Sequence, residues 1–230
     1  MIARPPIAVP LSAGLVLAVL TVLLIVEPTI VAQVDGPLSE RLRGYAADRP
    51  ALVTVLRYAT DLAATVSFVA AGVAATVLFA LRRERTRAWF CGVVTVVVPA
   101  GWFAGQWLLH RPRPVDGFIT VAANGFPSGH TTNAAAVAVA VVLLAWPGAS
   151  RRGRLLVVTL VGLGAGFIGA TRLLLLAHWP VDVIGGCLLA VLLVSLVARW
   201  VPGPSGPPAP PVTPPGKVSS RDGSCEVRRS

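Results

Sequence analysis

The feature that most constrains this chain is a series of apolar runs, each long enough to cross a lipid bilayer. A membrane-spanning helix needs roughly 20 consecutive apolar residues. Runs of about this length lie at residues 7–26, 62–81, 88–109, 131–146, 155–177 and 181–201. Hydrophobic residues make up 55% of the 230 residues and charged residues only 13%, which excludes an ordinary soluble domain. The pattern predicts an all-α fold, an integral membrane bundle of six helices.

The two ends of the chain are interpreted separately. Arg4 precedes the first run, as in a secretory signal peptide, but the run is long enough to span and no small-residue cleavage site follows it. We therefore expect an uncleaved first span. Residues 202–230 are rich in Pro, Gly and Ser and then become basic, with too little apolar surface to offset the entropy of ordering. We predict a six-span domain over residues 1–201 and a disordered cytoplasmic tail over residues 202–230.

The net charge of +10 is concentrated in short loops, without the basic stripe and interleaved aromatics of a nucleic-acid binder. Residues 82–87 and 151–154 are rich in arginine, whereas residues 35–61 carry no net charge. Cytoplasmic loops carry the excess of Lys and Arg. The sequence therefore predicts a plasma-membrane protein with both termini in the cytoplasm. Almost all basic residues are arginine, which with abundant Ala and Val suggests the GC-rich DNA of a bacterium.

Most other polar residues lie in two connections between spans, at residues 106–132 and 171–182. Both connections follow odd-numbered spans, so they share one face of the membrane. All three histidines are there, namely His110, His130 and His178. Ionisable groups near the membrane are costly and indicate function by default. We expect the active site at this extracytoplasmic interface.

The fourth span is preceded by Pro127, Ser128, Gly129 and His130. Ser128 is a natural N-cap, so the amides after it should point outward from a helix N-terminus, where an anion is favoured. The segment predicts a phosphate cradle. The alternative is an ordinary helix start with an interfacial histidine.

The connection between the last two spans places Asp182 four residues after His178, with Pro180 in the first helical turn. A carboxylate beside one imidazole nitrogen fixes the tautomer and leaves the other nitrogen free to attack. The fork-shaped guanidinium of Arg172 suits a phosphoryl group. His178 is therefore a candidate nucleophile. The alternative is a structural Arg–Asp pair with a bystander histidine.

Prolines flank Arg113 where the chain leaves the third span, and Arg111 and His110 precede it. Because the prolines restrict the backbone, we expect these cations to form a rigid, positively charged rim where the chain leaves the span. For Arg111 and His110 the alternative role is electrostatic anchoring to anionic lipid. Glycines at 162–169 and 185–186 are expected to allow close packing of the last two spans.

Together these segments resemble the three-part signature of the type 2 phosphatidic acid phosphatases, which are related to bacterial acid phosphatases and vanadium haloperoxidases. The signature reads Lys-x6-Arg-Pro, Pro-Ser-Gly-His and Ser-Arg-x5-His-x3-Asp. It is matched at Arg113, Pro114, Pro127, Ser128, Gly129, His130, Arg172, His178 and Asp182. Gln106 replaces the Lys of the signature, and Thr171 replaces the Ser. The motifs cover residues 106–182, and the six-span layout extends the resemblance over about residues 7–201.

The resemblance implies a membrane lipid phosphatase. His178, oriented by Asp182, would attack phosphorus to form a phosphohistidine, and His130 would protonate the leaving alkoxide and then activate water. The phosphate oxygens would be stabilised by Arg113, Arg172, Ser128 and Gly129, with Gln106 donating a hydrogen bond in place of the missing cation. Arg111 or His110 could supply that charge instead. Neither a metal nor another cofactor is expected.

Three lipid substrates fit this reading: phosphatidic acid, phosphatidylglycerol phosphate and a polyprenyl diphosphate such as undecaprenyl diphosphate. The oligomeric state is left open. Because of Gln106, a non-catalytic scaffold that binds lipid phosphate is the main alternative. A transporter would need an internal repeat or broken helices, which the sequence lacks, and haloperoxidases are expected on soluble chains.

Overall fold

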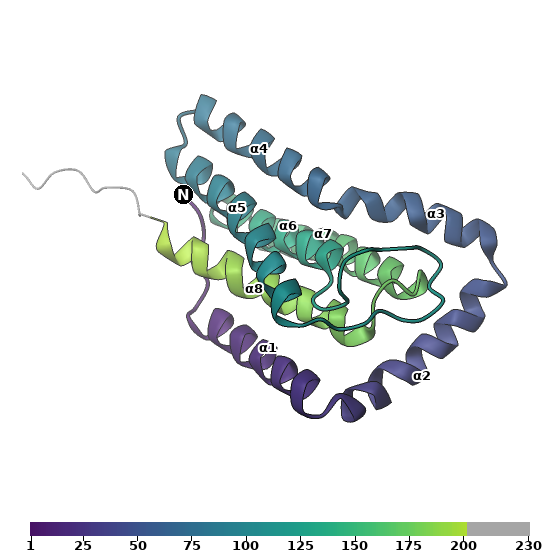
Figure 1. Cartoon of the computed structure of the whole chain (residues 1–230). Coiled ribbons are helices and arrows are strands. Elements are labelled where there is room, and N and C mark those ends of the chain that lie inside the picture. Colours follow the sequence, from purple (N-terminus) through teal and green to yellow (C-terminus); the bar gives the residue numbers. More distant parts are fainter. Residues whose placement is uncertain (202–230) are drawn as a thin grey trace, which may run out of the picture.

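The computed structural model describes residues 1–201, and every regular element in that range is a helix (Figure 1). The helices are α1 (Ala8–Val26), α2 (Pro28–Ala47), α3 (Pro50–Thr60), η1 (Asp61–Ala63), α4 (Thr65–Leu81), α5 (Arg85–Leu108), α6 (Gly129–Ala145), η2 (Trp146–Gly148), α7 (Arg151–Leu174) and α8 (Pro180–Trp200). Six helical stretches are long and apolar enough to span a membrane. The predicted fold class, an all-α six-span membrane bundle, is confirmed. The tail predicted over residues 202–230 lies outside the described residues.

The largest departure from the prediction is the stretch at residues 35–61, which we expected as a loop. It is helical almost throughout, as part of α2 and as α3. Pro28 and Pro50 stand in the first turns of these helices, where the fixed φ of proline suits a helix start. α2 crosses one end of the bundle between α1 and α3 (Figure 1). We expected helices only where the sequence has a long apolar run, and α2 is a helix without one.

α5, α6 and α8 supply most of the apolar core. Phe90, Val98, Ala136, Ala190 and Val194 are almost completely buried there. Helices α6 and α8 approach so closely that a Cβ on Gly186 would lie 2.7 Å from the Ser128 carbonyl oxygen. The predicted role of the α8 glycines in close packing is therefore confirmed.

The glycines of α7 behave differently. An added Cβ on Gly162, Gly164 or Gly166 would meet nothing within 4 Å, whereas one on Gly169 would lie 3.2 Å from Val183. The prediction that these glycines pack against another span is thus wrong for the first three. Their spacing matched a packing motif, but all three are exposed on α7, and no atom of residues 1–201 lies close enough to contact an added Cβ.

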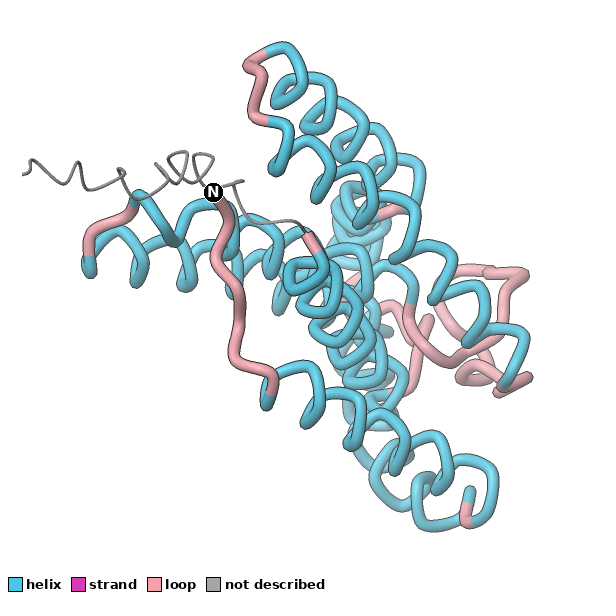
Figure 2. Tube along the Cα trace, turned by 90° about the vertical axis from the view of Figure 1, so that its left-hand side faces the viewer, coloured by secondary structure: helices cyan, strands magenta, loops and turns pink. Residues whose placement is uncertain are grey.

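The long connection from α5 to α6 folds over the turn between α7 and α8, and Figure 2 shows these loops gathered at one end of the helices. The Phe118 amide donates to the Leu175 carbonyl at 3.0 Å. α7 ends at Leu174, before the predicted 177, because Leu176 takes a left-handed conformation with φ 49°. The Ala177 and Leu176 amides then donate to the carbonyls of Arg172 and Leu173 and close the helix end.

Candidate active site

Ser128 occupies the N-cap position of α6, as predicted, but its hydroxyl does not cap the helix. The Ser128 Oγ lies 3.0 Å from Thr131 Oγ1, and the Ser128 amide donates to the Asp182 carbonyl at 3.0 Å. Within the described chain, no partner is found for the amides of Gly129, His130 and Thr131. This helix N-terminus therefore retains the free donors that an anion requires.

His178 is 2% exposed and lies in the turn before α8. Its Nδ1 is 2.7 Å from the Gly125 carbonyl oxygen. Because a carbonyl only accepts, Nδ1 carries the proton and Nε2 keeps its lone pair. Asp182 Oδ2 is 3.6 Å from Nδ1, beyond hydrogen-bond length. Gly125, which sequence analysis missed, is therefore the closer partner of the ring, and Asp182 acts on it at longer range.

The surroundings of His178 keep its ring neutral. Burial lowers its pKa from 6.5 to about 4, with the nearby Asp182 carboxylate opposing the shift and the Arg113 and Arg172 cations adding to it. At neutral pH Nε2 therefore carries a lone pair in place of a proton, as a nucleophile requires.

Arg113 lies beside this lone pair, with Nη1 2.9 Å from His178 Nε2. Its other contacts are backbone carbonyls: Nε donates to Ala123 at 2.6 Å, Nη1 to Ala177 at 2.6 Å and Nη2 to Asn124 at 2.8 Å. Burial lowers the pKa of Arg113, and the Asp182 charge opposes this shift. Arg113 thus ties the loop to the turn that carries His178 while keeping its charge beside Nε2.

Arg172 is 1% exposed and has few partners for a guanidinium. Its Nη1 donates to Thr60 Oγ1 at 3.1 Å, and its buried Nε has no partner among residues 1–201. No carboxylate in the described part of the chain forms an ion pair with it. A buried charge without a counter-ion is unfavourable, so this arrangement is suited to an incoming anion.

Arg172 and His130 line one cavity of about 390 Å³. Its other walls come from α3, from the start of η1 and from the connection between α5 and α6, through Thr54, Arg57, Tyr58, Thr60, Asp61, Ile119, Thr120 and Val121. His130 also lies within electrostatic range of Arg172, His178 and Arg113. The structure therefore brings both predicted catalytic histidines and both predicted phosphate-binding arginines to the same end of the bundle.

Asp182 belongs to a buried ionic network. Its Oδ1 accepts from Arg111 Nη1 at 2.5 Å, and its Oδ2 accepts from the Trp179 amide at 2.9 Å. Arg111 Nη2 pairs with Asp35 of α2, whose Oδ1 accepts from the Val181 amide at 3.0 Å. Arg111 is therefore neutralised by two carboxylates, which contradicts our suggestion that it supplies the missing cation.

Gln106 lies next to the site and supports the loop. Its Nε2 donates to the carbonyls of Phe126 and Pro127, both at 3.1 Å, and its buried Oε1 has no partner in the described residues. Gln106 and His110 line a second cavity, of about 310 Å³, to which Arg172 does not contribute. The amide donors expected to bind phosphate are thus engaged by the backbone that leads to Ser128.

Thr60 is a site residue that sequence analysis missed. It is 3% exposed, accepts from Arg172 and lies 3.1 Å from Thr171 Oγ1. Its position at the end of α3 gave no local signal. As to metals, no cluster of three or more His, Cys, Asp or Glu side chains that could hold an ion occurs within residues 1–201.

A helical membrane bundle with one buried arginine, a free helix N-terminus and a neutral imidazole at one end is a membrane protein with a candidate anion site. The sequence pattern of the PAP2 superfamily matches residues 101–204, which include all three motifs. In this segment the chain is similar to the PAP2 superfamily, which agrees with the resemblance to type 2 phosphatidic acid phosphatases.

Individual proteins with the same similarity can be named. Phosphatidylglycerophosphatase B of Escherichia coli K12 is 43% identical over 88 residues, which cover 36% of this chain and 33% of that protein, and the Shigella flexneri protein matches equally well. The chain thus aligns with about a third of the length of these curated relatives. The crystal structure of a transmembrane PAP2-type phosphatidylglycerolphosphate phosphatase from Bacillus subtilis is similar in fold. It has a TM-score of 0.66 at 24% identity and covers 84% of this chain and 96% of that one.

Proposed function

We propose that this protein is a membrane lipid phosphatase that hydrolyses a lipid phosphomonoester or diphosphate through a phosphohistidine intermediate. The observation that carries the proposal is Arg172, a buried cation with an unpartnered donor and no ion-paired carboxylate among residues 1–201, on the same cavity as His130. A phosphate group would supply the missing counter-charge and accept the free hydrogen bond.

The geometry supports an in-line displacement by His178. The Nε2 lone pair attacks phosphorus, an N–P bond forms, and the P–O bond to the lipid breaks as His130 protonates the leaving oxygen. A water molecule, deprotonated by His130, then attacks phosphorus. The N–P bond breaks, its electron pair returns to Nε2, and inorganic phosphate leaves.

The other site residues stabilise charge on the phosphoryl oxygens. During attack, the Arg113 donor that rests on Nε2 transfers to an oxygen of the substrate. The Gly129 amide and the first-turn amides of α6 donate to the same group, as does the Ser128 hydroxyl. The Gly125 carbonyl holds the Nδ1 proton throughout, and Asp182 stabilises the positive charge on the ring.

The substrate class follows from position and from the relatives. The cavity lies at the end of membrane-spanning helices, so a headgroup can enter while its lipid chain stays in the bilayer. Phosphatidylglycerol phosphate is the first candidate, because relatives named as phosphatases of this lipid match the chain. Phosphatidic acid and undecaprenyl diphosphate present the same terminal phosphate. We further propose that the site faces the extracytoplasmic side and needs no metal.

The test is phosphate release by the purified full-length protein in detergent with EDTA, using phosphatidylglycerol phosphate, phosphatidic acid and undecaprenyl diphosphate. We expect activity on at least one of these lipids and its loss in His178→Ala. His110→Ala is the matched control, because His110 lies in the other cavity, and it should stay active. A wild type that binds the lipids without turnover would instead support the scaffold.

The intermediate and the role of Gln106 need their own measurements. Retention of label in base and its loss in acid are diagnostic: ³²P from the terminal phosphate should attach to wild type or His130→Ala as an acid-labile, base-stable adduct, and not to His178→Ala. Gln106→Lys should raise the rate if the absent cation limits turnover. An unchanged rate would mean that other groups already supply the charge.

A further inference from the structure

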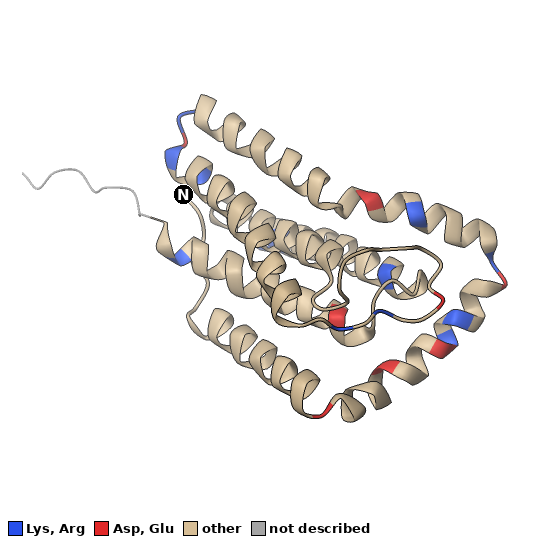
Figure 3. Cartoon of the chain, viewed as in Figure 1, with Lys and Arg blue, Asp and Glu red and all other residues tan. Residues whose placement is uncertain are grey.

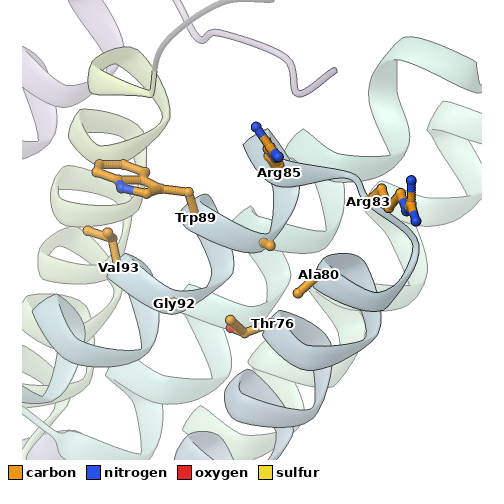
Figure 4. Close-up of a pocket in the computed structure, with 8 residues that line it drawn as sticks. Thr76, Ala80, Arg83, Arg85, Trp89, Gly92 and Val93 are labelled. Carbon is orange, nitrogen blue, oxygen red and sulfur yellow. The ribbon is translucent and has the colours of Figure 1, made fainter.

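A second ligand site is indicated at the opposite end of the bundle from the candidate active site. There a cavity of about 660 Å³ opens between the end of α4 and the start of α5 (Figure 4). Its lining is Thr76, Ala80, Arg83, Arg85, Ala88, Trp89, Gly92 and Val93. None of these residues takes part in the chemistry described above.

The interior of the cavity is apolar and lies between two membrane spans. The helices touch deeper in the bundle, where a Cβ on Gly72 would lie 2.0 Å from Thr95 Oγ1. Nearer the loop, small side chains such as Ala80 and Ala88 leave the space open, and Trp89, which is 47% exposed, forms one side. Hydrocarbon is the favoured occupant of such a space at membrane depth.

The mouth of the cavity is positively charged. Figure 4 shows Arg83 and Arg85 standing above the small residues. The only acidic residue of the loop, Glu84, pairs with Arg87 at 2.8 Å, so no carboxylate in the described chain pairs with Arg83 or Arg85. The loop itself is tightly closed, with the Glu84 amide donating to the Phe79 carbonyl at 2.9 Å.

We propose that this cavity binds one anionic phospholipid. The lipid phosphate lies between Arg83, Arg85 and the positive N-terminal end of α5, and an acyl chain fills the apolar space against Trp89. An amphipathic ligand is required because the cavity joins an apolar interior to a cationic mouth. The proposal does not depend on the phosphatase activity.

The experiment uses the full-length protein, delipidated in a neutral detergent and titrated with phosphatidylglycerol or with phosphatidylcholine of the same chains. Binding is counted by native mass spectrometry, and the melting temperature is followed in parallel. We expect one tightly bound phosphatidylglycerol and a higher melting temperature with that lipid only. Equal binding of the two lipids would overturn the proposal.

Matched variants distinguish a specific lipid-binding site from a general attraction of anionic lipid to basic loops. R83Q/R85Q should weaken phosphatidylglycerol binding by about 30-fold, the loss expected for two arginines near an anionic headgroup. R151Q/R152Q removes the same charge from the start of α7, away from the cavity, and should bind as the wild type does. Ala88→Leu, which fills the cavity and keeps both arginines, should also weaken binding. Equal losses in the two arginine variants would mean that only net charge matters.

Discussion

His178 shows how the setting of a single residue determines its chemistry. Its ring is almost completely buried, and its Nδ1 proton is held by the Gly125 carbonyl. A protonated imidazole would place an additional charge beside Arg113 and would have no lone pair for attack. Burial therefore serves reactivity, because it favours the neutral form that a nucleophile needs.

This burial predicts a pH-dependent stability. The pKa of His178 falls from 6.5 in the unfolded chain to about 4 in the fold. Below pH 6.5 the unfolded chain therefore binds a proton that the folded protein does not, so stability is full above 6.5 and is lost as the pH falls toward 4. The loss should reach roughly 3 kcal/mol. Unfolding in detergent at several pH values measures it.

His178→Asn is the matched variant, because its side-chain amide can still donate to Gly125 but does not titrate. Its stability should depend on pH between 6.5 and 4 by about that much less than the wild type. If the two proteins lose stability in parallel, His178 is not the titrating group.

At the scale of elements, the contact between α6 and α8 assembles the site. Gly186 lies against the Ser128 carbonyl and Thr132, and the Asp182 carbonyl accepts from the Ser128 amide. The helix start with the free amides is thereby held next to the turn that carries His178. A glycine is needed at 186 because any side chain would separate the two helices.

We predict that Gly186→Ala destabilises the protein by about 1–3 kcal/mol, the usual cost of overpacking, and lowers the rate of phosphate release. The added Cβ would lie 2.7 Å from the Ser128 oxygen and 3.0 Å from Thr132 Oγ1. Thermal unfolding and kinetic assays measure the two effects.

Gly164→Ala is the control on α7, because its Cβ would meet no atom within 4 Å in the described structure. It should be neutral or slightly stabilising, since alanine favours the helix. Similar behaviour of the two variants would show that the α6–α8 contact is not tight.

At the scale of the whole molecule, charge differs between the two ends of the bundle. The end that carries the N-terminus is basic at the turn between α4 and α5 and at the end of α8, whereas the stretch from α2 to η1 carries both signs (Figure 3). The candidate active site lies at the other end of the bundle, where α2 and α3 are found. By the positive-inside rule, this asymmetry predicts that the basic end faces the cytoplasm.

We predict that a membrane-impermeant maleimide labels Val115→Cys in intact cells, because Val115 is 72% exposed in the loop over the site. Gly148→Cys, before the arginines of α7, should react only after lysis. Both variants are made without the three native cysteines. The reverse pattern of labelling would place the active site in the cytoplasm.

Part of this architecture could be predicted from short stretches of the sequence. The six spans were predictable because a run of about 20 apolar residues is a local property with one stable environment. The three motifs could be predicted to share one end of the bundle because they lie in connections on the same side. α2 and α3 were missed because they lack such runs, and Leu176 ended α7 early without a glycine to signal it.

The sequence by itself determined the membrane class, the spans and the family motifs, since apolar length and short spacings are properties of neighbouring residues. Only the tertiary structure decided what each polar group does. Gly125 holds His178 from 53 positions away, and Asp35 neutralises Arg111 across 76. Such pairings follow from how the helices pack, because burial makes each polar group seek whatever partner the fold brings near.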